Sequence, residues 1–207
     1  MQLIVDPRSS SCLRVLCFLA CKGLEIPTRH VRLMQGEHRQ SGYLDINPAG
    51  ALPALVLPDG DTLTQSLAIM ELLEAWHPAV PTLPDNARQR AMVKAICGHI
   101  VSDMHPLTNL RVRRALGESL PEGEAAVAHW CRTWTASGLQ ALEGLLTRHA
   151  GQWCVGDAVT MADFCLAPQM LNAARFGCAL SDYPVANRIY RRCLDHPAFA
   201  AVVQASA

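Results

Sequence analysis

The chain has 207 residues, half of them hydrophobic, and its 18 Lys and Arg residues balance its 18 Asp and Glu residues. A neutral chain has no overall field that would draw it to nucleic acid or to an anionic membrane, so we expect neither partner. Charges such as Lys22, Glu71 and Lys94 interrupt the apolar runs before they reach the roughly 20 residues of a membrane span. We expect no cleavable leader, a cytoplasmic location and an ample core.

Nine cysteines are scattered through the sequence, and no two of them are spaced as in a C-x-x-C motif. Their odd number and irregular spacing argue against a disulfide framework, a zinc site and a dithiol redox pair. We therefore expect no metal, and we expect most cysteines to be small core residues in a reducing compartment.

The N-terminal segment has the pattern of a strand, a helix and a second strand. Residues 3–5 are a short apolar run, residues 13–22 form an apolar helix that Gly23 ends, and residues 28–33 alternate. This spacing predicts two parallel strands joined by a right-handed crossover. Three hydroxyls, Ser9, Ser10 and Ser11, fall on the turn before the helix, where backbone N–H groups and the helix dipole favour an anion. We hypothesise that this anion is a thiolate.

A hairpin and a helix follow. Residues 35–41 are polar and predict a loop, and residues 43–46 predict a short helix that Asn47-Pro48 ends. Residues 52–57 and 62–64 flank an Asp-Gly turn, which is typical of a β-hairpin. Pro53 belongs at an edge or in a special turn, and a cis bond before it is possible. Ser66 is placed to cap a helix over 67–76.

Beyond the prolines at positions 78, 81 and 84 the pattern is helical to the end of the chain. The sequence predicts an α/β domain over 1–80, a linker over 81–87 and an all-helical domain over 88–207. Within the last we expect one helix over 87–116 with a kink at Pro106, and a helix over 124–149. We also expect a helix that a Thr160–Asp163 capping box opens, and shorter helices over 184–194 and 197–203.

This order of elements resembles the glutathione transferase family, which has a thioredoxin-like N-terminal domain and a C-terminal helical bundle. The run Arg8-Ser9-Ser10-Ser11-Cys12-Leu13-Arg14 resembles the motif of the zeta class, the maleylacetoacetate and maleylpyruvate isomerases. The chain departs from that motif where Ser11 stands in place of the usual cysteine. Further matches occur in family order: Asn47-Pro48, Leu52-Pro53-Ala54-Leu55, Gln65-Ser66-Leu67-Ala68-Ile69, His105-Pro106-Leu107-Thr108-Asn109-Leu110 and Thr160-Met161-Ala162-Asp163.

The resemblance implies that glutathione is the cofactor and that residues 1–80 bind it. One of the serines, with Ser9 first by position and Ser11 and Ser10 as alternatives, would contact the sulfur. The backbone of Leu52, before Pro53, would pair with the cysteinyl part of the tripeptide. The remaining contacts implied are Gln65 and Ser66 for the γ-glutamyl carboxylate, His38 for the glycine carboxylate, and His105 with Asn109, one helical turn apart, from the helical domain. Asp163 we assign to helix capping.

The activity implied is cis–trans isomerisation of a maleyl-type keto-diacid, in which the thiolate adds, the bond rotates and the thiolate leaves. Arg8, Arg111 and Arg175 would hold the carboxylates of this small dicarboxylate substrate. The sequence does not choose between maleylpyruvate and maleylacetoacetate. One alternative is a general transferase that conjugates glutathione to electrophiles, and another is a binding protein that has lost the chemistry. The family also implies a homodimer.

Overall fold

The computed structural model describes the backbone of residues 1–204 and the side chains of residues 1–203. The chain divides into two compact units, Met1–Pro81 with the segment that begins at Leu194, and Thr82–Cys193. The linker expected over 81–87 begins at this division. The C-terminal helix α9 (Pro197–Gln204), which we expected in the helical half, belongs to the first unit because it packs against α1 (Ser10–Lys22). Within the described residues, no helix combines the length and apolarity of a membrane span.

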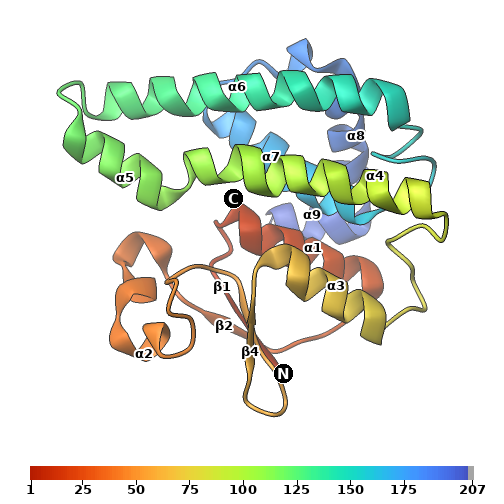
Figure 1. Cartoon of the computed structure of the whole chain (residues 1–207), viewed down its shortest axis with the longest axis horizontal. Coiled ribbons are helices and arrows are strands. Elements are labelled where there is room, and N and C mark those ends of the chain that lie inside the picture. Colours follow the sequence, from red (N-terminus) through yellow and green to blue (C-terminus); the bar gives the residue numbers. More distant parts are fainter. Residues whose placement is uncertain (205–207) are drawn as a thin grey trace. The chain divides into compact units, whose positions relative to one another are not determined.

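The first unit contains a four-stranded sheet in the order β2-β1-β3-β4. Strand β1 (Gln2–Val5) runs parallel to β2 (Thr28–His30) and antiparallel to β3 (Ala54–Val56), which pairs with β4 (Thr62–Thr64). Helices α1 and α3 (Ser66–Trp76) lie along one face of this sheet (Figure 1). The predicted parallel strands and hairpin are therefore confirmed, and so is the thioredoxin-like fold class.

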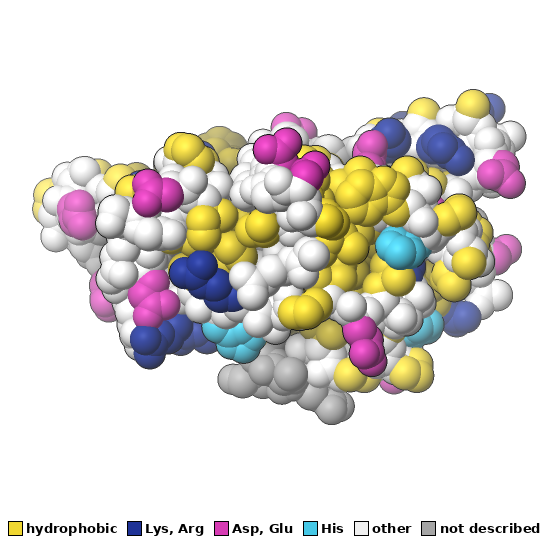
Figure 2. Space-filling model, turned by 90° about the horizontal axis from the view of Figure 1, so that it is seen from below, with side chains coloured by type: hydrophobic (Ala, Val, Ile, Leu, Met, Phe, Trp, Pro, Cys, Tyr) yellow, Lys and Arg dark blue, Asp and Glu magenta, His cyan; other side chains and the backbone are white. Residues whose placement is uncertain are grey.

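Local chemistry explains these boundaries. Leu3, Ile4 and Val5 are almost completely buried, and α1 ends where Gly23 adopts a left-handed φ of 66°. Strand β2 ends at His30, before the predicted end at 33, and a 3₁₀ turn (Leu33–Gln35) begins at that predicted end. The expected loop over 35–41 contains a second 3₁₀ turn (Glu37–Arg39), and the short helix α2 (Ser41–Leu44) begins two residues before its predicted start. Figure 2 shows charges of both signs scattered around a hydrophobic area, as a net charge of zero would allow.

The second unit is helical. It contains α4 (Ala87–Gly98), a π-helical turn (His99–Met104), a 3₁₀ turn (His105–Thr108), α5 (Leu110–Ser119), α6 (Glu124–His149), α7 (Met161–Arg175), a 3₁₀ turn (Leu180–Asp182) and α8 (Pro184–Asp195). The prediction of one helix over 87–116 was wrong. Pro106 has no N–H to continue the helical ladder, and Asn109 adopts an extended ψ of 162° and starts a new helix. The predicted capping box of α7 is confirmed, since Thr160 and Asp163 exchange both of its hydrogen bonds.

Candidate functional site

The serine run lies where β1 leads into α1, but the helix begins three residues before its predicted start at 13, so Ser10 and Ser11 already belong to its first turn. Ser9 is the N-cap of α1, and its Oγ accepts a hydrogen bond from the Cys12 backbone N–H at 3.4 Å. Ser10 is buried in the first helical turn, whereas Ser9 and Ser11 are half-buried. A hydroxyl that accepts from its own helix keeps its proton for a second partner. The Ser9 O–H is thus able to donate to an anion at the start of α1.

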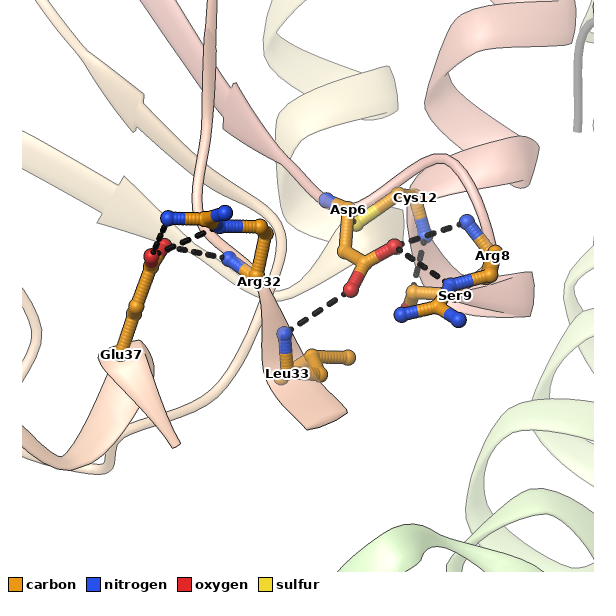
Figure 3. A network of polar contacts seen from close by, with 7 residues as sticks. All are labelled: Asp6, Arg8, Ser9, Cys12, Arg32, Leu33 and Glu37. Carbon is orange, nitrogen blue, oxygen red and sulfur yellow. Dashed lines mark hydrogen bonds and ion pairs between the residues drawn. The ribbon is translucent and has the colours of Figure 1, made fainter. Parts of the chain in front are cut away.

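Asp6 organises this turn, a role that was not predicted from the sequence. Its buried carboxylate accepts from the backbone N–H groups of Arg8 and Leu33, each at 2.9 Å, through different oxygens (Figure 3). The Arg8 Nε lies 3.8 Å from the same carboxylate, while 60% of the Arg8 side chain stays exposed. Asp6 thereby links the serine turn to the segment after β2 and fixes the position of the Arg8 backbone. A carboxylate directly after a buried strand was the signal available in the sequence.

Cys12 points into the interior of the turn. Its Sγ accepts from the Asp6 backbone N–H at 3.5 Å, and the residue is completely buried. Burial raises the pKa of the Cys12 thiol to about 12, and this effect outweighs the hydrogen bonds that favour the thiolate. A reactive cysteine needs a low pKa and access to its substrate. Cys12 therefore serves as a core residue of the fold.

The loop before β3 is held from two sides. The Leu52–Pro53 peptide bond is cis, and the carbonyl of the preceding Ala51 accepts hydrogen bonds from the buried side chains of Tyr43 and Asn47. These contacts fix the backbone that leads into Leu52. His38 is buried rather than solvated, with an exposed fraction of 5%.

The turn that carries His38 lies against this same loop. A Cβ at Gly50 would lie 3.0 Å from the His38 carbonyl oxygen, so the backbone of the loop passes close to His38. The two segments expected to contact the cysteinyl and glycine parts of glutathione are therefore neighbours.

The start of α3 differs by one residue from the prediction. Gln65 is the N-cap, with a φ of 73°, and Ser66 is the first helical residue and is buried. Ser66 Oγ accepts a hydrogen bond from Arg14 Nη1, at 3.3 Å, across from α1. Arg14 is a second residue whose role was not predicted from the sequence, although a charged residue on a mostly apolar helix is an unusual feature.

The register of the sheet brings these candidates together. Ile4 pairs with Ala54, and Ala54 pairs with Thr64. The serine turn after β1, the Leu52–Pro53 bond before β3, and Gln65 with Ser66 after β4 must therefore lie at the same edge of the sheet. One edge thus presents a hydroxyl at a helix N-terminus, a constrained backbone segment and a second helix N-terminus.

In the second unit, Asn109 Oδ1 accepts from the Val112 N–H at 3.2 Å and so caps α5. His105 begins the 3₁₀ turn before it, so the prediction that His105 and Asn109 lie one turn apart on a continuous helix was wrong. Arg111 on α5 and Arg175 at the end of α7 are exposed.

These two arginines lie near a contact between α5 and the end of α7. The Arg113 guanidinium lies 5.8 Å from the centre of the Phe176 ring. Arg111 is two residues from Arg113 along the chain, and Arg175 immediately precedes Phe176. The second unit therefore carries two exposed cations close in sequence to one interhelical contact.

Comparison with known proteins gives consistent results across the chain. The glutathione S-transferase N-terminal domain model matches residues 8–76, and the C-terminal domain model matches residues 115–205. A maleylacetoacetate isomerase of Pseudomonas aeruginosa is 38% identical over 201 residues, which are 96% of this chain and 93% of the relative.

Two solved structures share the fold over almost the whole length. The holo form of a maleyl pyruvate isomerase, a bacterial zeta-class glutathione S-transferase, is 33% identical with a TM-score of 0.94, over 100% of this chain and 98% of that one. A maleylacetoacetate isomerase of Anaeromyxobacter dehalogenans 2CP-1, with dicarboxyethyl glutathione and citrate bound in its active site, is 39% identical with a TM-score of 0.86. That match covers 97% of this chain and 89% of the other. The chain therefore belongs to the glutathione S-transferase family.

Proposed function

We propose that this protein is a glutathione-dependent cis–trans isomerase of a maleyl-type keto-diacid, such as maleylpyruvate or maleylacetoacetate. The observation that carries the proposal is similarity over nearly the full length to isomerases of both substrates. Similarity limited to the glutathione-binding residues would support only a general glutathione transferase. The geometry agrees, because the candidate glutathione contacts of the first unit share one edge of the sheet.

Glutathione supplies the thiol that adds to the substrate. A thiol pKa of about 8.5 must fall by one to two units, which corresponds to about 1.4 to 2.7 kcal/mol. The Ser9 hydroxyl and the N-terminus of α1 can together stabilise a thiolate by this amount. Leu52 would pair with the cysteinyl backbone, Gln65 and Ser66 would bind the γ-glutamyl carboxylate, and His38 would lie toward the glycine end.

The thiolate adds to the activated cis double bond, and the negative charge moves to the neighbouring carbonyl oxygen as an enolate. Rotation about the new single bond and loss of the thiolate give the trans product and return glutathione. In the Anaeromyxobacter dehalogenans structure glutathione carries a dicarboxyethyl group, which is the kind of adduct that such an addition forms. Arg8, Arg111 and Arg175 would bind the substrate carboxylates. His105 and the side-chain amide N–H groups of Asn109 would contact glutathione.

The test follows the ultraviolet absorbance of maleylpyruvate and of maleylacetoacetate with and without glutathione, while free thiol is counted. Loss of the cis isomer that needs glutathione but does not consume it supports the proposal. Stoichiometric consumption of thiol would favour the general transferase instead, and inactivity on both substrates would contradict the proposed isomerase activity. Ser9→Ala, Ser10→Ala and Ser11→Ala then show which hydroxyl contacts the sulfur, since the pKa of bound glutathione rises only in that variant.

We further propose that the first unit, which contains residues 1–80 and α9, forms the glutathione-binding domain and that the second unit, Thr82–Cys193, forms the substrate-binding domain. We also propose that the protein acts as a cytoplasmic homodimer. Family membership supports the dimer, and nine free thiols are compatible with a reducing compartment. Light scattering during gel filtration should give twice the mass of the chain. Cell fractionation should place the protein with cytoplasmic markers.

A further inference from the structure

The side chain of Arg14 reaches from α1 to the first residue of α3. Arg14 is 1% exposed, and its Nη1 donates to Ser66 Oγ at 3.3 Å, while Ser66 is 3% exposed. This hydrogen bond joins residues 52 positions apart in the sequence and is itself buried. The serine that we propose to bind the γ-glutamyl carboxylate is therefore held in place by a buried cation.

The direction of this hydrogen bond decides what Ser66 can do. A guanidinium N–H can only donate, so Ser66 Oγ must act as the acceptor. The hydroxyl has one proton, and the Arg14 contact turns that proton away from the guanidinium. A positive donor also polarises the O–H bond and makes the hydroxyl a stronger donor to an anion.

The backbone at the same position favours an anion as well. The N-cap residue of α3, Gln65, makes no side-chain hydrogen bond to the first N–H groups of the helix. Gln65 also adopts a φ of 73°, which non-glycine residues rarely take. The first turn of α3 thus presents N–H groups and the Ser66 hydroxyl together, and a helix N-terminus of this kind suits a carboxylate.

We propose that Arg14 is a positioning residue for glutathione: by donating to Ser66 Oγ it orients the Ser66 hydroxyl toward the α-carboxylate of the γ-glutamyl group. This inference rests on the proposed function, because it concerns the same cofactor site. Arg14 makes no contact with the ligand in this arrangement and acts only through Ser66. Its effect must therefore be specific to ligands that carry the γ-glutamyl group.

The dipeptide Cys-Gly separates this role from a purely structural one, because it keeps the thiol and the glycine carboxylate but lacks the γ-glutamyl group. Titration by nuclear magnetic resonance, which reaches weak affinities, gives Kd for glutathione and for Cys-Gly. The variants are Arg14→Met, Arg14→Lys, Ser66→Ala and the Arg14→Met/Ser66→Ala double variant. We expect Arg14→Met to weaken glutathione binding by about tenfold to a hundredfold, the usual value of a hydrogen bond to a charged group, and to leave Cys-Gly binding unchanged.

Arg14→Lys and the double variant distinguish a positioning role of Arg14 from a role in packing alone. Arg14→Lys keeps the charge and a donor, so it should recover part of the affinity and covers the case in which Arg14→Met fails to fold. In the Ser66→Ala background, loss of Arg14 should cause no further loss of glutathione affinity.

Lys22→Met is the matched control, because Lys22 is the other buried cation of α1. Its Nζ contacts Glu74 Oε2 at 2.6 Å, the His77 carbonyl at 2.8 Å and the Val80 carbonyl at 2.6 Å, away from Ser66. This variant should lower the melting temperature without changing the preference for glutathione over Cys-Gly.

Two results would overturn this inference but not the proposed function. One is an equal loss of affinity for glutathione and for Cys-Gly in the Arg14 variants. The other is a further loss of glutathione affinity when Arg14→Met is added to Ser66→Ala. Failure of the unmodified protein to bind glutathione would overturn the proposed function itself, so the two failures are distinguishable.

Discussion

Buried thiols make the stability of this protein depend on pH. Burial raises the pKa values of Cys12 and Cys17 to about 12 each, whereas an unfolded chain has thiol pKa values of about 8.5. Below pH 8.5 both states hold the proton, and above it only the folded state does, so stability is lost as pH rises toward 12. We expect the free energy of unfolding to fall by at most about 1.4 kcal/mol per pH unit for each such thiol. Urea titrations between pH 7 and 10 measure this slope, which should be shallower in Cys12→Ala.

Asp6 is the residue that holds the serine turn, so its amide replacement tests that geometry. Asp6→Asn keeps the shape but replaces one acceptor oxygen by a donor, which then faces the backbone N–H of Arg8 or Leu33. A buried donor without an acceptor costs about 1 to 3 kcal/mol, and denaturant titration should show a loss of this size. Glu37→Gln is the control, since Glu37 also accepts from a backbone N–H, that of Arg32, but in an exposed position. A loss in Glu37→Gln as large as that in Asp6→Asn would contradict this account.

At the scale of the elements, hydrophobic periodicity and turn residues predicted a helix or strand correctly wherever both pointed to the same structure. The hairpin over residues 52–64 was predicted from its Asp-Gly turn, and helix 124–149 from its uninterrupted pattern. The stretch over 87–116 was not predicted correctly. Its hydrophobic spacing continues through Pro106, while the backbone changes from α to π and then to 3₁₀ geometry. Spacing alone cannot reveal such a change, because the π segment of 6 residues and the 3₁₀ segment of 4 residues are too short for their different periods to show in the sequence.

Asn109 is the side chain that starts a new helix after this irregular stretch. Asn109→Ala should lower the free energy of unfolding by about 1 kcal/mol, because α5 loses its N-cap, and Asn109→Asp should restore most of it. Melting temperatures of the two variants measure the difference. If Asn109→Ala keeps full stability but weakens glutathione binding, the ligand contact outweighs the cap.

At the scale of the whole molecule, the order of the motifs predicted the family, and the strand register explains why distant motifs meet. Ser9, Leu52 and Gln65 are far apart in sequence, and they share an edge because β1, β3 and β4 are neighbours in the sheet. Asp6 and Arg14 were missed because their roles depend on tertiary partners, the Leu33 N–H and the Ser66 hydroxyl. Charged residues that a fold buries become interpretable only when their partners are known.

The position of α9 gives a prediction about how the chain is stabilised. Phe199 on α9 is completely buried, and α9 packs against α1 within the first unit although it ends the sequence. Phe199→Ala should cost about 3 to 5 kcal/mol, since it removes a large core side chain and leaves a cavity. Hydrogen exchange followed by mass spectrometry should show the loss of protection chiefly in α1 and β1, with α6 of the second unit affected less. Ala198→Ser, a half-buried change on the same helix, is the control and should leave both units protected. Equal loss of protection in α1 and α6 would mean that the two units unfold as one, and α9 would then stabilise the whole chain rather than the glutathione-binding half.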